Sequence, residues 1–171
     1  GAEENKQYLL TIAAPVGPGN IQNIELGLVA SLVDWINLMG YDFHGTWEST
    51  TNFNAPLFRT AQDPADRSLN VDAAVQRYLI EGVPAEKLVL GVPFYGKGWQ
   101  GVPNINNGLY QIAKGAAPGT WEPGSYEYKD IVKNFLYIFG QRIPFRLVHH
   151  DKHGGGVADI GAVGRMLDNL R

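Results

Sequence analysis

The 171-residue chain contains no cysteine, which excludes a disulfide framework and a thiolate metal site. It also lacks an apolar run long enough to cross a membrane, and its N-terminus, Gly-Ala-Glu-Glu-Asn-Lys, has no signal-peptide pattern. Basic residues are few, since 14 Lys and Arg stand against 17 Asp and Glu, for a net charge of −3. This charge balance predicts no nucleic-acid partner, and the lack of an apolar span predicts no membrane partner.

The residues that are present are typical of a globular domain. Hydrophobic residues make up 44% of the chain and charged residues 18%, so a chain of this length can form a real core. The 21 glycines and ten prolines predict many turns and long loops.

Three short apolar segments read as buried strands of a parallel sheet, at residues 8–15, 36–41 and 88–93. Two helical patterns separate them. The first helix contains Ile24, Leu28 and Leu32, and the second is capped by Asn70 and ended by Gly82. A polar, non-periodic stretch of about twenty residues, 48–67, has the length of a functional loop. The order of strands and helices predicts a parallel α/β architecture.

The alternation stops after residue 93, and the composition changes to Gly, Asn, Tyr and Trp. We interpret residues 1–98 as one segment, 99–140 as an inserted α+β module with a short helix at 129–139, and 141–171 as a divergent tail ending in a helix at 159–170. The tail contains His149, His150, Asp151 and His153. Adjacent histidines on an extended chain point to opposite faces and a triple glycine follows, so we expect a solvated loop, with no metal or cofactor.

Polar and aromatic residues gather at the end of the second predicted strand. The segment 35–47 reads Trp-Ile-Asn-Leu-Met-Gly-Tyr-Asp-Phe-His-Gly-Thr-Trp. Strand alternation puts Met39 and Tyr41 on one face, and Asp42 falls where the strand becomes a loop. Open α/β sheets and barrels bind ligands at such strand ends, so this is the candidate site. His44 is interpreted as a loop histidine rather than a catalyst.

Four motifs in order give the chain a family resemblance. They are Tyr-Leu-Leu-Thr-Ile-Ala-Ala-Pro-Val-Gly-Pro at 8–18, Met-x-Tyr-Asp at 39–42 with Thr-Asn-Phe-Asn-Ala-Pro-Leu-Phe at 51–58, the strand and turn at 88–99, and Gly-Leu-Tyr-Gln-Ile-Ala-Lys-Gly-Ala-Ala-Pro-Gly-Thr-Trp-Glu at 108–122. Together they resemble the bacterial chitinases of glycoside hydrolase family 18. The resemblance implies strands 5 to 7 of a (β/α)8 TIM barrel, followed by the start of the chitinase insertion domain.

The resemblance also implies a chemistry, a substrate and a location. Family 18 hydrolyses β-1,4-linked N-acetylglucosamine polymers with retention, using the substrate's own N-acetyl oxygen as nucleophile. By resemblance, Tyr41 donates to the acetamido carbonyl and Asp42 binds the sugar and the catalytic acid. The implied contacts to chitin or its oligosaccharides come from Met39, Trp47, Tyr95 and Trp99. The family resemblance implies an extracellular, secreted enzyme.

The departures from the family pattern limit the function expected of this chain. The family's acid lies in an Asp-x-x-Asp-x-Asp-x-Glu motif on the fourth strand, and no such motif occurs here. A complete barrel needs about 250 residues. We therefore expect the isolated chain to be inactive. Two other interpretations stay open: a lectin-like remnant that binds chitin oligosaccharides without cleavage, and a fragment without function whose tail after Gly140 is frame-shifted.

Overall fold

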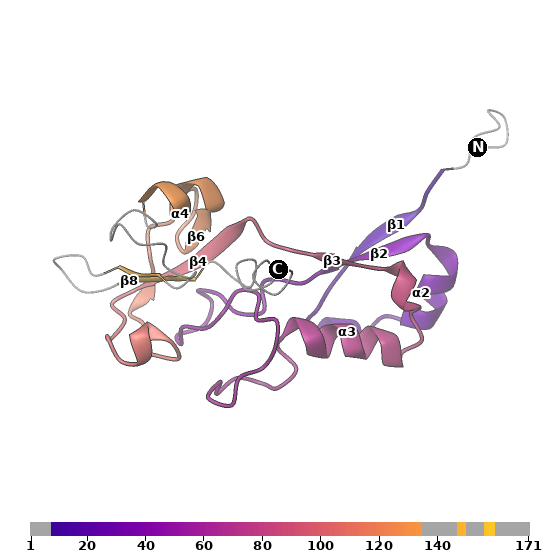
Figure 1. Ribbon diagram of the computed structural model, residues 1–171, viewed down its shortest axis with the longest axis horizontal. Helices are drawn as coiled ribbons and strands as arrows, with labels where there is room; N and C mark the ends of the chain where they lie inside the picture. The colour runs from indigo at the N-terminus through magenta and orange to yellow at the C-terminus, as the bar shows by residue number, and fades with distance from the viewer. Residues whose placement is uncertain (1–7, 135–146, 150–155, 160–171) are drawn as a thin grey trace, which may run out of the picture.

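The computed structural model describes residues 8–134, 147–149 and 156–159, and the statements below refer to these residues. They form two units that lie side by side along an elongated molecule (Figure 1). One unit is built on a parallel sheet, and the other on an antiparallel sheet. A short connection after the third strand of the parallel sheet leads from the first unit to the second.

The parallel sheet contains three strands in the order β1 (Thr11–Ala14), β2 (Trp35–Met39) and β3 (Leu88–Gly91). Both pairings are parallel, with Ile12 opposite Ile36 and Leu38 opposite Leu90. The three strands predicted from the apolar segments are confirmed, with shorter bounds than expected. Residues 8–10, expected to belong to β1, precede it and are exposed.

Helices connect these strands and lie along one side of the sheet (Figure 1). They are α1 (Pro18–Ile21), α2 (Leu26–Leu32), α3 (Val71–Ile80) and a 3₁₀ turn, η1 (Ala85–Lys87). The Asn70 side chain accepts a hydrogen bond from the Ala73 N–H at 2.9 Å, which confirms the predicted cap of α3. The four-residue helix α1 was not predicted, because Gly17 to Asn20 has the composition of a turn.

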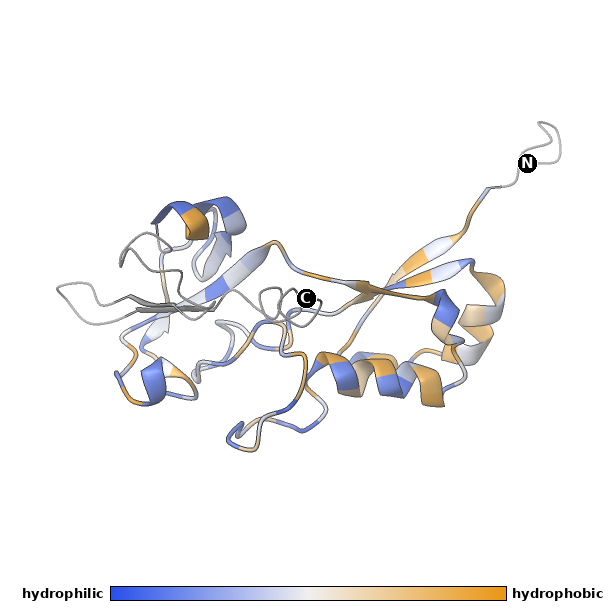
Figure 2. Cartoon of the chain, in the orientation of Figure 1, coloured by the Kyte–Doolittle hydropathy of each residue, from blue (hydrophilic) through white to orange (hydrophobic). Residues whose placement is uncertain are grey.

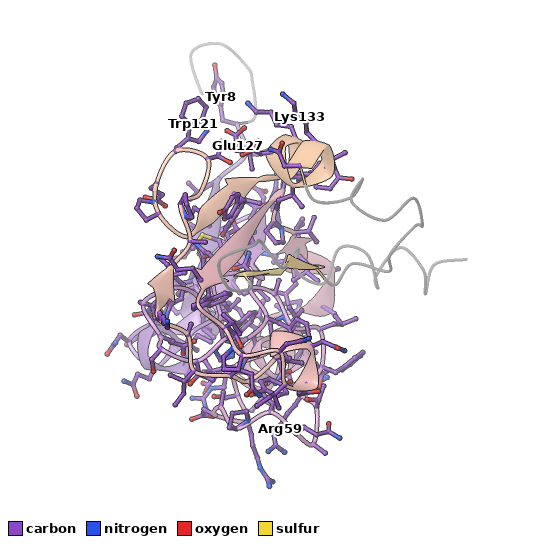
Figure 3. All side chains as sticks on the ribbon, turned by 90° about the vertical axis from the view of Figure 1, so that its left-hand side faces the viewer. Tyr8, Arg59, Trp121, Glu127 and Lys133 are labelled. Atoms are coloured by element: carbon purple, nitrogen blue, oxygen red, sulfur yellow. The ribbon has the colours of Figure 1, made fainter. Side chains whose placement is uncertain are left out.

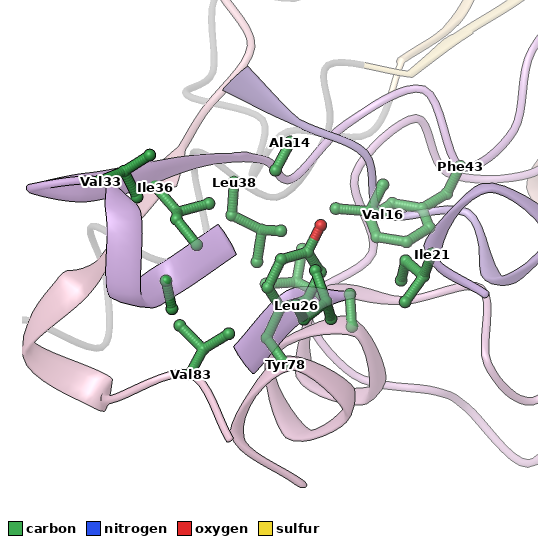
Figure 4. Packing of buried hydrophobic residues seen from close by; sticks show 13 residues of the cluster. Ala14, Val16, Ile21, Leu26, Val33, Ile36, Leu38, Phe43, Tyr78 and Val83 are labelled. Carbon is green, nitrogen blue, oxygen red and sulfur yellow. The ribbon is translucent and has the colours of Figure 1, made fainter. Parts of the chain in front are cut away.

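The core lies between the sheet and these helices (Figure 4). Ile36 and Leu38 of β2 are fully buried there, and Tyr78 of α3 packs beside them with a ring that is 0% exposed. The Tyr78 hydroxyl donates to the Pro15 carbonyl at 2.7 Å. The alternate β2 residues, including Met39, are only half-buried on the opposite face. Figure 2 shows the apolar character of the sheet and the mixed character of α3.

The second unit is organised around β4 (Tyr95–Gln100). It pairs antiparallel with β5 (Gly115–Ala116), β6 (Ser125–Glu127) and β8 (Gly156–Asp159), and β8 pairs with β7 (Leu147–His149). A 3₁₀ turn, η2 (Asn106–Gly108), and a helix, α4 (Tyr128–Asn134), complete it. We call this unit, residues 95–134 with β7 and β8, the module.

The module differs from the expected division in two ways. It begins at Tyr95 rather than at residue 99, because the backbone after Pro93 pairs with β6 instead of extending β3. It also includes two short strands from the predicted tail. The predicted helix at 129–139 is confirmed as far as Asn134. The predicted helix at 159–170 is wrong at its first residue, which ends β8, and its remainder lies outside the described residues. Most of the His149–His153 cluster also lies outside them.

Candidate active site

The backbone turns sharply as β2 ends. The Gly40 N–H donates to the Leu38 carbonyl at 2.9 Å, and the Tyr41 N–H donates to the Met39 carbonyl at 2.7 Å. Gly40 leaves no room for a side chain, because a Cβ there would lie 2.7 Å from Leu90 Cδ1 and 2.9 Å from the Gly91 carbonyl oxygen. Asp42 then adopts a left-handed backbone with φ of 59°. This conformation is uncommon outside glycine and gathers at functional sites.

Asp42 faces a lysine that comes from the module. The Lys97 Nζ lies 3.3 Å from Asp42 Oδ1, and 3.4 Å from the Ser125 hydroxyl. The Lys97 side chain is 11% exposed, whereas that of Asp42 is 46% exposed. The carboxylate is therefore open to solvent while its counterion is enclosed. This ion pair joins the end of β2 to β4.

Aromatic rings surround the ammonium group of Lys97. Its Nζ lies 5.1 Å from the centroid of the Tyr95 ring and 5.4 Å from the centroid of the Trp47 ring, both within cation–π distance. Tyr95 also meets Tyr41 edge to face, with the two centroids 6.0 Å apart. The structure thus brings together four of the predicted site residues, Tyr41, Asp42, Trp47 and Tyr95.

The pKa of the Tyr95 phenol reflects this environment. Burial raises its pKa well above the ordinary value, and the hydrogen bond and negative charge of Asp42 raise it further. A side-chain hydrogen bond with Asn54 acts in the opposite direction and lowers the pKa of Tyr95. The Tyr95 hydroxyl therefore stays protonated and available as a donor across the neutral range.

The predicted tryptophans lie in different environments. Trp47 is 61% exposed, with its ring beside Gly45, so much of its aromatic surface is accessible. Trp99 is 1% exposed, packs with Val102 in the interior of the module, and donates from Nε1 to the Glu48 carbonyl at 3.3 Å. The prediction that Trp99 stacks on substrate is therefore wrong, since the described structure encloses both faces of its ring. An indole suits a buried core as well as a binding surface.

Trp121 lies at the periphery of the module (Figure 3) and is 79% exposed. Its Nε1 donates to Glu127 Oε1 at 2.5 Å, and the Lys129 ammonium lies 5.6 Å from its ring centroid.

Met39 is half-buried on the face of β2 that the helices do not cover.

The histidine of the same loop is buried and contacts a carboxylate of that loop. His44 is 1% exposed, and its Nδ1 lies 2.9 Å from Glu48 Oε2. The carbonyl of Glu48 accepts the hydrogen bond from Trp99, so this pair connects the loop after β2 to the module. Within the described ranges, no three His, Cys, Asp or Glu side chains are grouped as they would be to hold a metal ion.

Two residues of the site escaped the sequence reasoning. Lys97 was not among the predicted site residues, and Asn54 was seen only as part of the motif at 51–58. The structure places both beside Asp42: the Asp42 N–H donates to Asn54 Oδ1 at 3.0 Å. No periodic pattern links positions 42, 54 and 97. Strand pairing and a long loop bring them together.

Comparison with known proteins agrees with this arrangement. The sequence profile described as Glycosyl hydrolases family 18 matches residues 1–160, which is most of the chain. The chain belongs to glycoside hydrolase family 18. This confirms the resemblance read from the four motifs.

Chitinases are among the similar family 18 proteins. Chitinase A1 of Niallia circulans is 46% identical over 142 residues, which cover 80% of this chain and 20% of that protein. The structure of chitinase ChiA74 from Bacillus thuringiensis superposes with a TM-score of 0.81 at 36% identity, covering 96% of this chain and 29% of that one. YKL-39, solved in the presence of chitooligosaccharides, gives a TM-score of 0.79 at 26% identity and covers 99% of this chain and 50% of that one.

These coverages show the extent of the match. The family 18 chain described here spans between one fifth and one half of the length of these three relatives. Its parallel sheet corresponds to part of a (β/α)8 barrel, the fold implied by the family and by its structural neighbours. In the described part of the chain, no helix is both long and apolar enough to span a bilayer.

Proposed function

We propose that this chain contributes the acetamido-binding side of a chitinase active site, for hydrolysis of β-1,4-linked N-acetylglucosamine polymers. The observation that carries the proposal is the pairing of the Asp42 carboxylate with Lys97, beside the exposed ring of Trp47. It joins a charged group and an aromatic face at the end of a parallel strand, where barrels place their active sites. We also propose an extracellular location, on the family resemblance alone.

The proposed reaction is substrate-assisted. The N-acetyl oxygen of the sugar attacks its own anomeric carbon, an acid protonates the leaving oxygen, and water then opens the cyclic intermediate with net retention. The protein must hold the acetamido group and stabilise the positive charge that develops on it. In this proposal the Tyr41 hydroxyl donates to the acetamido carbonyl, and the Asp42 carboxylate accepts from the acetamido N–H and balances the charge.

The surrounding residues hold the sugar and the carboxylate. Trp47 offers an apolar ring to a pyranose face, and the Tyr95 hydroxyl is placed to donate to Asp42. Lys97 restrains the Asp42 carboxylate from the side of the module. Met39 lines the half-buried face of β2 beneath these groups. Trp99 contributes indirectly, because its Nε1 donates a hydrogen bond to the Glu48 carbonyl and so restrains the loop that carries Trp47.

The acid of this mechanism is a glutamate of a motif that the 171 residues do not contain. We therefore propose that the isolated chain does not hydrolyse chitin. The test is turnover of a chromogenic chitobioside by the purified chain, with the expectation of a background rate. Turnover well above background would overturn this part of the proposal.

A chimera tests the residues themselves. The matching stretch of Chitinase A1, which is 46% identical, is replaced by the corresponding residues of this chain, so that the host supplies the acid. The chimera is expected to hydrolyse chitobiosides. Tyr41→Phe and Asp42→Asn should then each lower kcat by about 100-fold, the effect of removing one donor or charge aimed at a transition state. Tyr128→Phe, a matched change in the module, should leave kcat unaltered.

A lectin-like function is the second candidate, and the exposed ring of Trp47 beside the Asp42–Lys97 pair supports it. The same residues would then bind chitin oligosaccharides without cleavage. Calorimetric titration of the 171-residue chain with chitotetraose separates the candidates. Binding that Trp47→Ala abolishes, without any hydrolysis product, supports the lectin-like function. Absence of binding to the isolated chain, together with an active chimera, supports the chitinase segment.

A further inference from the structure

Asn54 makes contact with the end of β2 through both of its carbonyl groups. Its side-chain Oδ1 accepts a hydrogen bond from the Asp42 N–H at 3.0 Å, and its main-chain oxygen accepts one from the Phe43 N–H at 3.0 Å. Asn54 is 0% exposed. One buried residue therefore satisfies two consecutive donors of the segment that carries the candidate site.

The residue held in this way is the strained one. Asp42 has φ of 59°, a left-handed conformation that is unfavourable for an L-residue. Such a conformation persists only where its surroundings determine it. The Oδ1 of Asn54 supplies that determination, because its hydrogen bond is formed only when the Asp42 N–H points at the loop.

The loop that carries Asn54 is itself anchored to the module. Thr51 is 1% exposed, and its hydroxyl donates to the Gly108 carbonyl at 2.5 Å. The Thr51 N–H donates to the Gln111 carbonyl at 2.9 Å, and the Tyr110 N–H donates to the Thr51 carbonyl at 3.0 Å. The module thus sets the position of Asn54, and Asn54 sets the backbone at Asp42.

We propose that Asn54 is a positioning residue, which fixes the left-handed backbone of Asp42 and thereby aims the Asp42 carboxylate at Tyr95 and Lys97. This inference deepens the proposed function and rests on it for the role of Asp42 toward substrate. Its tests need no sugar. Failure of the chitinase or lectin-like proposal therefore leaves them interpretable, and their failure leaves the functional proposal standing.

Amide hydrogen exchange of the 171-residue chain gives the first test. Asn54→Ala should speed exchange of the Asp42 N–H by at least about fivefold, the loss of one neutral hydrogen bond. Exchange of the Phe43 N–H should change less, because its acceptor is the main chain of residue 54. Asn54→Asp keeps an oxygen acceptor and should restore protection of the Asp42 N–H.

Asn52→Ala is the matched control. Asn52 is also buried, lies in the same loop, and bonds Asp63 and the Phe53 N–H rather than Asp42. It should leave the exchange of the Asp42 N–H unchanged. Equal acceleration at Asp42 and Phe43 in Asn54→Ala would mean that the loop has merely opened, and this result would overturn the proposal.

The ionisation of Tyr95 gives the second test. The direction in which Asn54→Ala shifts the pKa of Tyr95 separates two possible roles of Asn54. Hydrogen bonding to Asn54 lowers the pKa of Tyr95, whereas the carboxylate of Asp42 raises it. If Asn54 acted on the phenol alone, Asn54→Ala would make Tyr95 harder to ionise. If Asn54 holds Asp42 in place, the carboxylate moves away in Asn54→Ala and Tyr95 becomes easier to ionise, as it should in Asp42→Asn.

The readout is the carbon-13 signal of the Cζ atoms of labelled tyrosine, with the Tyr95 signal assigned from Tyr95→Phe. At about pH 11, where an ordinary phenol is mostly ionised, Tyr95 should be protonated in the unchanged chain. Its ionised fraction should increase in Asn54→Ala and in Asp42→Asn. If Asn54→Ala does not fold, Asn54→Ser, whose hydroxyl is too short to reach the Asp42 N–H, replaces it in both tests. A decrease in the ionised fraction overturns the proposal.

Discussion

The two units of this chain are stabilised by different forces. The barrel segment, β1 to β3 with its helices, has one continuous apolar core of 13 buried residues. Among the described residues of the module, the corresponding cluster consists of Trp99 and Val102, with Ala113 packed against it. Ala117 and Ile131 are also buried there. Polar contacts accompany this smaller apolar set: Thr120 Oγ1 donates to Asp130 at 2.8 Å, and hydrogen bonds from Lys129 and Trp121 hold the pKa of Glu127 below its ordinary value.

This difference bears on the site, which lies where the two units meet. Asp42 belongs to the barrel segment, while Lys97 belongs to the module. The position of the carboxylate therefore depends on apolar packing beneath it and on polar contacts beside it. Changes in the core should cost the most stability, and changes at the ion pair the least.

Leu38→Ala tests the apolar side of the comparison and should have the largest effect. Leu38 is 1% exposed at the centre of the core, so the truncation should lower the free energy of unfolding by about 2–5 kcal/mol. Denaturant-induced unfolding measures the loss. Leu32→Ala in α2 is the matched control, because Leu32 is 67% exposed and its truncation should cost far less. Equal losses in the two variants would contradict the assignment of the core.

Gly40→Ala tests the close packing at the end of β2. The added Cβ would lie 2.7 Å from Leu90 Cδ1 and 2.9 Å from the Gly91 carbonyl oxygen, so the strands must separate. We expect a loss of about 1–3 kcal/mol in the free energy of unfolding. At Gly19 a Cβ meets nothing within 4 Å, so Gly19→Ala should be neutral or slightly stabilising. If Gly40→Ala left the free energy of unfolding unchanged, the end of β2 would accommodate the added Cβ without strain, which would contradict the prediction.

The barrel segment was predictable from sequence because its forces leave a local pattern. Val71, Ala74 and Tyr78 recur at helical spacing, and all three are buried as that spacing predicts. The module leaves no such pattern. Its central strand β4 pairs with β8, some sixty residues away in the chain, and its partner strands are too short to show an alternation.

The candidate site was predictable only where it follows the strand. Tyr41 and Asp42 come directly after an apolar run, so their place at a strand end could be read from the sequence. The contribution of Asn54 could not be read, since an asparagine in a polar loop has the same appearance whether or not it supports a distant backbone. Trp99 shows the converse: its type fits a sugar-binding surface, but burial assigns it to packing.

Tyr78→Phe tests two contributions of the Tyr78 hydroxyl to the free energy of unfolding: its hydrogen bond at neutral pH and its ionisation at alkaline pH. Losing the 2.7 Å hydrogen bond to the Pro15 carbonyl should cost about 1 kcal/mol at neutral pH. Burial raises the pKa of Tyr78 from 10.0 to about 12, so between these values the unfolded chain binds fewer protons than the folded one. The unchanged chain should therefore lose about 2–3 kcal/mol as the pH rises through this window.

Denaturant unfolding as a function of pH measures this effect. The phenylalanine variant has no hydroxyl to ionise, so its stability should decline less steeply than that of the unchanged chain. The two curves are expected to cross within the window, because the alkaline loss of the unchanged chain exceeds its advantage at neutral pH. Parallel curves across the window would show that Tyr78 does not contribute to the alkaline loss.

Lys97→Met tests the polar side of the comparison and should have the smallest effect on stability. It removes an ion pair with a half-exposed carboxylate and two cation–π contacts, together worth about 1 kcal/mol. Lys97→Arg keeps the charge and the aromatic contacts, so it should retain most of that stability. The unfolding of both variants can be followed by tryptophan fluorescence, since Trp47 lies beside the ammonium.

The salt dependence of stability separates the electrostatic contribution of Lys97 from its packing contribution. At an ionic strength of about 1 M, where the Debye length is about 3 Å, the advantage of the unchanged chain over Lys97→Met should shrink. Because the Lys97 side chain is largely enclosed, part of the advantage should survive as contact with the aromatic rings. If the whole advantage persists at high salt, the contact between the two units depends on packing after all. The contrast between an apolar barrel segment and a polar module would then not extend to the site where they meet.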